Sequence, residues 1–208
     1  MSRELLTKHP DIRNFTTIWT DSIRNGTFDL ANTNKLIRFY DGATGLKTGS
    51  TGSAGYCLSA TAEKNGMELI AVVLKGKTSD ERFSDAKSLL NYGFSTWSLV
   101  TVTPDEVLPP VPVTLGVRGT VQPVLTSENT LLVEKTLANG LTKEVALAES
   151  VAAPVYAGDT LGQLTVRDAA GNTVAELPIL AGEDVGHVTF VQMLGRCLAR
   201  GFCVGPRS

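Results

Sequence analysis

The chain has 208 residues, of which 42% are hydrophobic and 19% charged, and this composition is typical of a globular protein of one or two domains. No apolar run approaches the roughly 18 residues that a membrane-spanning helix needs, and the net charge of −2 gives no basic face for nucleic acid. Three cysteines cannot make a disulfide framework, and the only two histidines, His9 and His187, lie too far apart in the sequence to suggest a metal site.

The first residues are typical of the middle of a domain. Residues 2–10 have neither the basic start nor the apolar core of a secretory signal. Apolar residues there recur at helical spacing, which predicts an opening helix to about Lys8. We therefore expect the chain to start inside a domain.

Residues 11–75 predict a loop region followed by a small sheet. Asn25-Gly26 is a hairpin-turn signal within the loop region, which spans Asp11 to Tyr40. Asn65-Gly66 is a second signal of this kind, and it predicts a tight turn between the last two strands. The segments predicted as strands are Gly45–Ser50, Gly55–Glu63 and Met67–Lys75.

A helix is predicted after these strands. Ser79 or Asp80 can cap its start. Apolar residues then form one stripe at helical spacing, namely Phe83, Ala86, Leu89, Leu90 and Tyr92. This stripe would cover one face of the sheet, so residues 1–100 are predicted to form a mixed α/β unit.

The composition changes at Pro104. Between Pro104 and Gly182 prolines are frequent, helical periodicity is nearly absent, and short runs such as 111–117 alternate apolar and polar residues. Residues 164–179 predict a hairpin around Asp168 to Asn172. We therefore expect a small all-β sandwich domain over residues 104–184.

The remaining residues, 185–208, predict an amphipathic helix. Four residues define its apolar stripe: Val191, Leu194, Leu198 and Phe202. The segment contains Arg196, Arg200 and Arg207, and no acidic residue follows Asp184. A terminal helix packed on its own domain is one interpretation. We favour the other, a helix lying in the membrane interface.

Lys47-Thr48-Gly49 is the tripeptide most suggestive of chemistry. An edge strand with lysine and threonine side chains toward a cleft offers a cation, a hydroxyl and unpaired backbone groups, which suits a peptide ending in a carboxylate. Gly49 allows close approach of such a ligand. Considered alone, the tripeptide is common, and a solvated strand lysine is the ordinary alternative.

Several short motifs in the same order resemble the serine-type D-alanyl-D-alanine carboxypeptidases, which are the low-molecular-mass penicillin-binding proteins. These motifs are Asn32 to Leu36, Asp41 to Thr51, Ala54 to Leu58, Gly76 to Thr78 with Glu81-Arg82, and Leu89 to Phe94. The resemblance implies that residues 1–100 are the C-terminal part of a β-lactamase-like transpeptidase domain. Residues 104–184 resemble the family's C-terminal β-domain, and residues 185–208 its membrane-anchoring helix.

The resemblance also implies roles for individual residues. Lys47 would assist proton transfer and attract the substrate carboxylate, and Thr48, Gly49 and Ser50 would bind the substrate, with the Ser50 N–H as half of an oxyanion hole. Arg82 would face the same carboxylate, although a solvated arginine in the first turn of a helix is the ordinary alternative. No cofactor or metal is implied. The implied partners are a peptidoglycan stem peptide ending in D-Ala-D-Ala, β-lactams, and the outer face of the cytoplasmic membrane.

The order of the motifs departs from the family. Ser84-Asp85-Ala86-Lys87 fits Ser-x-x-Lys and Ser127-Glu128-Asn129 fits Ser-x-Asn, but both follow Lys-Thr-Gly, whereas the family places them before it. We interpret both as coincidences. Cys57 has no histidine near it in sequence and is predicted to be a small buried strand residue. The nucleophile would therefore lie outside this chain.

The leading hypothesis is a part of a D-alanyl-D-alanine carboxypeptidase that is inactive alone, because acyl transfer needs the serine, its base and the oxyanion donors together. Two alternatives stay open. One is a non-catalytic protein of the same fold that binds the cell wall or a partner. The other is one half of a split enzyme.

Overall fold

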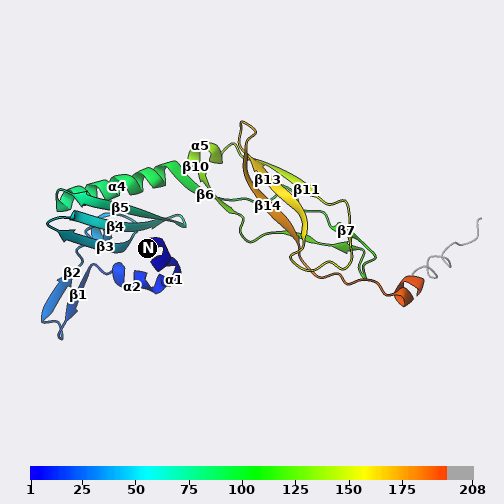
Figure 1. Ribbon diagram of the computed structural model, residues 1–208, viewed down its shortest axis with the longest axis horizontal. Coiled ribbons are helices and arrows are strands. Elements are labelled where there is room, and N and C mark those ends of the chain that lie inside the picture. The colour runs from blue at the N-terminus through cyan, green and yellow to red at the C-terminus, as the bar shows by residue number, and fades with distance from the viewer. Residues whose placement is uncertain (196–208) are drawn as a thin grey trace, which may run out of the picture. The chain divides into compact units, whose positions relative to one another are not determined.

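The computed structural model describes residues 1–195, which form two compact units (Figure 1). The first unit contains residues 1–99 and 132–136, and the second contains residues 100–131 and those from 137 on. The mixed α/β character predicted for the chain, with an all-β second part, is confirmed by these elements.

The first unit is built on a three-stranded antiparallel sheet in the order β3-β4-β5 (Figure 1). The strands are β3 (Ala43–Thr51), β4 (Gly55–Lys64) and β5 (Met67–Gly76), which confirms the three predicted segments. Asn65 and Gly66 make the turn between β4 and β5 with φ of 52° and 76°, as a tight hairpin requires.

Helix α4 (Ser79–Thr96) covers one face of this sheet (Figure 1). Its N-cap is Thr78, whose hydroxyl accepts the Glu81 N–H at 3.1 Å, so the predicted caps Ser79 and Asp80 lie one and two residues inside the helix. The buried residues that the helix and sheet share are Phe83, Ala86, Leu90, Leu58, Ala60, Ala62, Ala71 and Val73.

Two residues of the predicted helix stripe are exposed. Leu89 and Tyr92 face solvent, so their assignment to the buried stripe is wrong. Tyr92 follows Phe83 by nine residues. At 3.6 residues per turn this is two and a half turns, so Tyr92 lies on the opposite side of the helix from Phe83. The buried stripe is therefore narrower than predicted.

Short helices cover part of the other face. They are α1 (Ser2–Lys8), as predicted, and η1 (Pro10–Ile12) and α2 (Arg13–Thr16), which the sequence patterns did not predict. The Ser2 and Ser59 hydroxyls lie 2.9 Å apart, which fixes α1 against β4. Arg13 pairs with Glu68 of β5 at 2.5 Å, and this hydrogen bond raises the pKa of the arginine.

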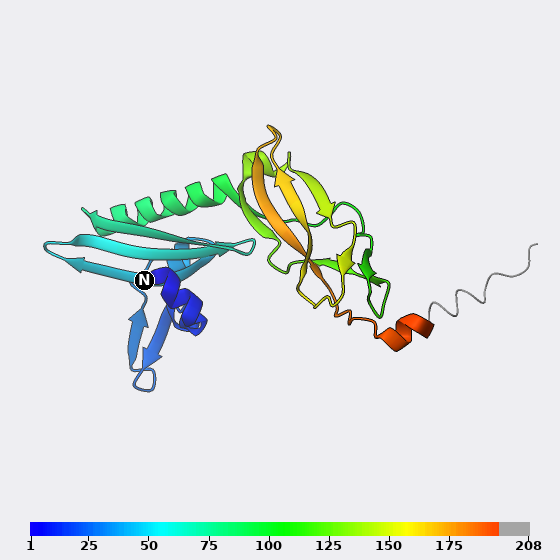
Figure 2. The ribbon, with the colours of Figure 1, turned by 45° about the vertical axis from the view of Figure 1, so that its right-hand side comes forward.

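A hairpin projects from the first unit (Figure 2). Strands β1 (Thr20–Ile23) and β2 (Phe28–Ala31) pair antiparallel, and Asn25 and Gly26 in the turn have positive φ, which confirms the predicted turn.

Helix α3 (Leu36–Phe39) follows the hairpin. Its Leu36 is fully buried, and the Asn34 side chain joins it to β3 by accepting the Leu36 N–H and donating to the Gly45 carbonyl.

The second unit contains two small sheets. Their strands, in spatial order, are β11 (Thr142–Leu147), β13 (Thr160–Arg167), β14 (Thr173–Ala181) and β9 (Pro123–Leu125) in one, and β12 (Val151–Ala152), β7 (Val111–Thr114) and β8 (Thr120–Val121) in the other. β13 and β14 form the predicted hairpin, whose turn is closed by Asp168 and Asn172. Alternate residues of these strands fill two buried clusters.

Three further elements complete the described chain. β6 (Trp97–Thr101) and β10 (Thr130–Glu134) pair as a two-stranded sheet, and the short helix α5 (Lys135–Ala138) follows β10. Residues 190–195 are helical. The rest of the predicted C-terminal helix, with Leu198, Phe202 and its arginines, lies outside the described residues. Among the helices of residues 1–195, none combines the length and the apolar character that crossing a membrane requires.

Candidate functional site

The Lys-Thr-Gly tripeptide lies on β3, at an edge of the sheet. β3 pairs with β4 only, with Lys47 opposite Ser59 and Gly49 opposite Cys57. The other side of β3 pairs with no strand among residues 1–195. An extended peptide can therefore add to this edge by backbone hydrogen bonds.

Lys47 presents its charge at this edge. The side chain is exposed, and its Nζ donates to the Thr48 carbonyl at 2.5 Å. Within the described chain, Lys47 forms no salt bridge with a carboxylate. Its ammonium group is thus available to a carboxylate of a ligand.

Thr48 is buried and bound to a residue that the sequence reasoning gave no role. Its hydroxyl lies 2.7 Å from the hydroxyl of Thr33. In such a pair one hydroxyl donates to the other, so one proton stays free for a further acceptor. Thr33 belongs to the segment 32–36 that carried part of the family resemblance, and that was the only signal that could have identified it.

Gly49 and Ser50 continue the edge toward solvent. A Cβ built on Gly49 would meet no protein atom within 4 Å, so the space beside this glycine is open. Ser50 is exposed on the same strand. These two positions leave room for a ligand to approach the backbone of β3, as expected from the sequence.

Arg82 lies beneath the end of the β3-β4 pair. It is only 7% exposed, so the alternative of a solvated surface arginine is wrong. Its Nη1 donates to the carbonyl oxygens of Gly49 at 3.3 Å and Cys57 at 3.2 Å, and its guanidinium packs between the rings of Tyr56 and Phe83. The structure therefore brings Arg82 directly against the tripeptide, where it fixes the position of the motif glycine.

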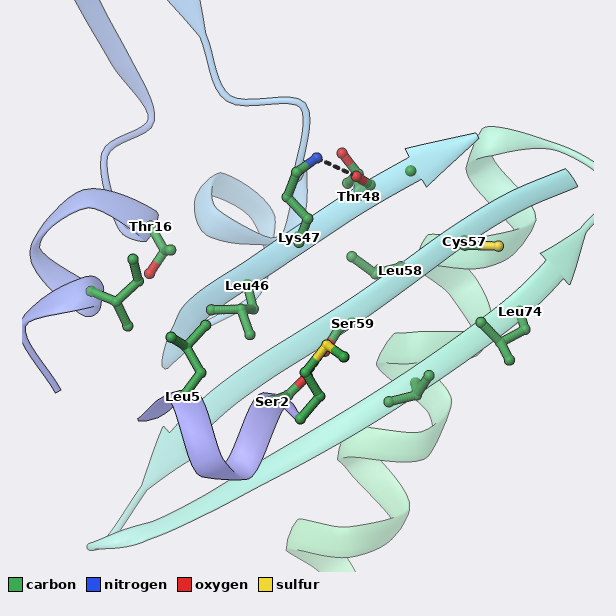
Figure 3. A pocket seen from close by; sticks show the side chains of 14 residues that line it. Ser2, Leu5, Thr16, Leu46, Lys47, Thr48, Cys57, Leu58, Ser59 and Leu74 are labelled. Carbon is green, nitrogen blue, oxygen red and sulfur yellow. Dashed lines mark hydrogen bonds between the residues drawn. The ribbon is translucent and has the colours of Figure 1, made fainter. Parts of the chain in front are cut away.

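A groove of about 490 Å³ runs from the tripeptide between α1 and the sheet (Figure 3). Lys47, Thr48 and Gly49 line it together with mainly apolar residues, which include Leu5, Leu46, Leu58, Val72 and Leu74. The groove lies on the face of the sheet opposite α4. Helix α1 covers only part of this face (Figure 3).

Cys57 also lines this groove. It is half-buried, and its Sγ lies 3.4 Å from the Ala54 carbonyl oxygen. The expectation of a buried strand cysteine is therefore wrong, because α1 leaves this part of the sheet uncovered. No histidine lines the groove.

The two serine motifs that follow Lys-Thr-Gly lie elsewhere. Ser84 is exposed on α4, the helix on the other face of the sheet, and is absent from the groove lining. Ser127 is exposed in a loop between β9 and β10. Within residues 1–195, no group of histidine, cysteine and acidic side chains could hold a metal ion.

Comparison with solved structures places this fold among the penicillin-binding proteins. Penicillin-binding protein 5 of Haemophilus influenzae shares the fold at a TM-score of 0.70 and 22% identity, over 88% of this chain and 54% of that one. The peptidoglycan synthesis regulatory factor PBP3 of Streptococcus pneumoniae gives a TM-score of 0.61 at 25% identity, over 88% of this chain and 55% of that one.

The sequence matches narrow this class. Residues 1–78 match the family model described as D-alanyl-D-alanine carboxypeptidase, and residues 100–187 match the C-terminal domain of penicillin-binding protein 5. The D-alanyl-D-alanine carboxypeptidase DacF of Bacillus subtilis is 34% identical over 203 residues, 95% of this chain and 52% of that protein. In both of its parts the chain is thus similar to the D-alanyl-D-alanine carboxypeptidases, and it spans about half the length of DacF.

Proposed function

We propose that the chain supplies the carboxylate-binding half of a serine-type D-alanyl-D-alanine carboxypeptidase. This enzyme would remove the terminal D-alanine from peptidoglycan stem peptides through an acyl-serine intermediate. The proposal depends on one observation: the exposed Lys47 ammonium, the Thr48 hydroxyl and the buried Arg82 meet at one free edge strand, at the positions that the family motif assigns.

The arrangement accounts for substrate binding. A stem peptide would add to the edge of β3, with its terminal carboxylate attracted by Lys47 and hydrogen-bonded by the Thr48-Thr33 pair and Ser50. Arg82 would act behind the strand, because its guanidinium is bonded to the Gly49 carbonyl rather than exposed to the groove. We assign Arg82 as a positioning residue that also contributes positive charge.

The nucleophile would come from a segment outside these 208 residues. No Ser-x-x-Lys precedes Lys-Thr-Gly in the sequence, and Ser84 lies on the wrong helix. The open part of the sheet supports this idea. The outer edge of β5 pairs with no strand among residues 1–195, and Val72 and Leu74 are exposed on the face of the sheet opposite α4. An unpaired edge and an exposed apolar face are both unfavourable unless another element covers them.

The test is to supply that segment. The chain would be combined with the part of DacF that it does not match, and D-alanine release from a peptide ending in D-Ala-D-Ala would be measured. We expect release from the combination and none from the chain alone. If the combination releases no D-alanine but still binds the peptide, the non-catalytic wall-binding alternative is correct.

We also propose that the C-terminal segment attaches the protein to the outer face of the cytoplasmic membrane. Phe190, Val191 and Leu194 are exposed, and three arginines follow them in the sequence. Co-sedimentation with anionic vesicles, with and without residues 186–208, measures this attachment. Binding that survives the deletion contradicts the proposal.

A further inference from the structure

One edge of the second unit carries large apolar side chains that its core does not use. Leu115 is 47% exposed, Val117 39% and Tyr156 60%. The first two follow β7, and the third follows the short strand β12. We call these three residues the apolar edge.

The loops that carry the apolar edge are bound to the backbone of residues 185–188. The Val188 N–H donates to the Leu115 carbonyl at 2.8 Å, on one side of this backbone. On the other side Val155 and Val185 exchange two backbone hydrogen bonds of 3.0 and 2.8 Å. Both loops are thus bound to residues 185–188, immediately before helical residues 190–195.

Leu115 stands in a backbone conformation that a leucine disfavours. Its φ is +59°, in the left-handed region that glycine and asparagine adopt more readily. Burial of the side chain does not offset the energetic cost of this backbone conformation, because about half of the side chain is exposed. A contact outside the folded chain would explain an apolar side chain at this position.

The carboxylates near the apolar edge are already bonded. Asp159 accepts the Tyr156 N–H at 2.7 Å, Asp184 accepts the Ala157 N–H at 2.6 Å, and Glu183 pairs with Arg118. Beyond Asp184 the sequence has three arginines and no acid. An apolar surface bound to residues 185–188, which precede three arginines in the sequence, fits a bilayer with anionic headgroups.

We infer that the apolar edge enters the membrane interface together with the C-terminal helix, so that Leu115, Val117 and Tyr156 form a second membrane contact built into the β-domain. This inference rests on the proposed membrane attachment. The β-domain would then be held in a defined orientation on the bilayer, because two loops and a helix fix it at separate points.

The test measures partition of the full chain into vesicles of anionic and zwitterionic phospholipid. The first variant combines Leu115→Asn, Val117→Ser and Tyr156→Ser, with asparagine chosen because it tolerates the positive φ. We expect its partition coefficient to fall at least about tenfold, since less apolar surface would leave water. Circular dichroism checks that the variant is folded.

A matched pair of single variants tests location. Val117→Ser removes a valine of the apolar edge, and Val145→Ser removes an equally exposed valine, 39% in each case, from the middle of β11. Only Val117→Ser should weaken binding. If the triple variant binds as tightly as the wild type while removal of residues 189–208 abolishes binding, the inference is wrong and the helix anchor stands. If the wild type does not bind, both are wrong.

Discussion

The two units of the chain differ in how completely each buries its own sheet. In the second unit both sheets contribute alternate residues to closed clusters, and Leu164, Val166 and Ile179 are fully buried. In the first unit α4 covers one face, whereas the opposite face leaves Val72 and Leu74 exposed beside the groove. The unit with the candidate edge strand is therefore the one that leaves its sheet partly open, which agrees with the proposal that a further segment covers it.

The largest expected effect compares two isoleucines. Ile179→Ala in the second unit should lower the free energy of unfolding by about 2–5 kcal/mol, because it removes buried atoms and leaves a cavity. Ile70→Ala on the partly open face of the first unit should cost much less, since Ile70 is already 36% exposed. Chemical denaturation of both variants measures the difference, and equal losses would contradict the comparison.

Removal of the Lys47 charge should have the next largest effect. We call the chain combined with the DacF segment the completed enzyme. In the completed enzyme, Lys47→Ala should lower kcat/KM by about 10²-fold or more, the scale for loss of a preorganised charge partner. Ser84→Ala is the control and should leave kcat/KM nearly unchanged, because Ser84 is exposed on α4. Equal damage in the two variants would show that the site is assigned to the wrong strand.

The sequence predicts the strands and the tripeptide better than it predicts the short helices and the burial of Arg82. The three predicted strand segments match β3, β4 and β5, with Asn65-Gly66 as the turn between the last two, and the order of several motifs along the chain identified Lys47-Thr48-Gly49. The single-turn helices α2 and α3 were missed because four residues carry too little periodicity to be recognised. Burial of Arg82 was also hidden, since it depends on carbonyl groups 25 and 33 residues away.

The Thr33 hydroxyl should have a smaller effect. Thr33→Val keeps the shape of the side chain but removes the partner of Thr48. We expect kcat/KM of the completed enzyme to fall about fivefold, the worth of roughly one neutral hydrogen bond. An increase in KM without a change in kcat would place this hydroxyl pair in substrate binding. No change in either constant would exclude Thr33 from the site.

The smallest expected effect on stability lies on the open face. Leu74→Ser should change the free energy of unfolding of the chain alone by no more than about 0.5 kcal/mol, because the side chain is 72% exposed. The same variant should weaken association of the chain with the added DacF segment. The dependence of D-alanine release on the concentration of that segment measures this association. A large loss of stability in the chain alone would show that this face is closed by the chain itself.

The most direct measurement is mass spectrometry of the chain after incubation with a labelled penicillin. The chain alone should gain no covalent adduct, since no Ser-x-x-Lys precedes Lys47-Thr48-Gly49 in its sequence and Ser84 lies on α4, on the other face of the sheet. With the segment of DacF added, the adduct should appear on a serine of that segment. A penicillin adduct on the 208-residue chain itself, at Ser84 or elsewhere, would contradict the account.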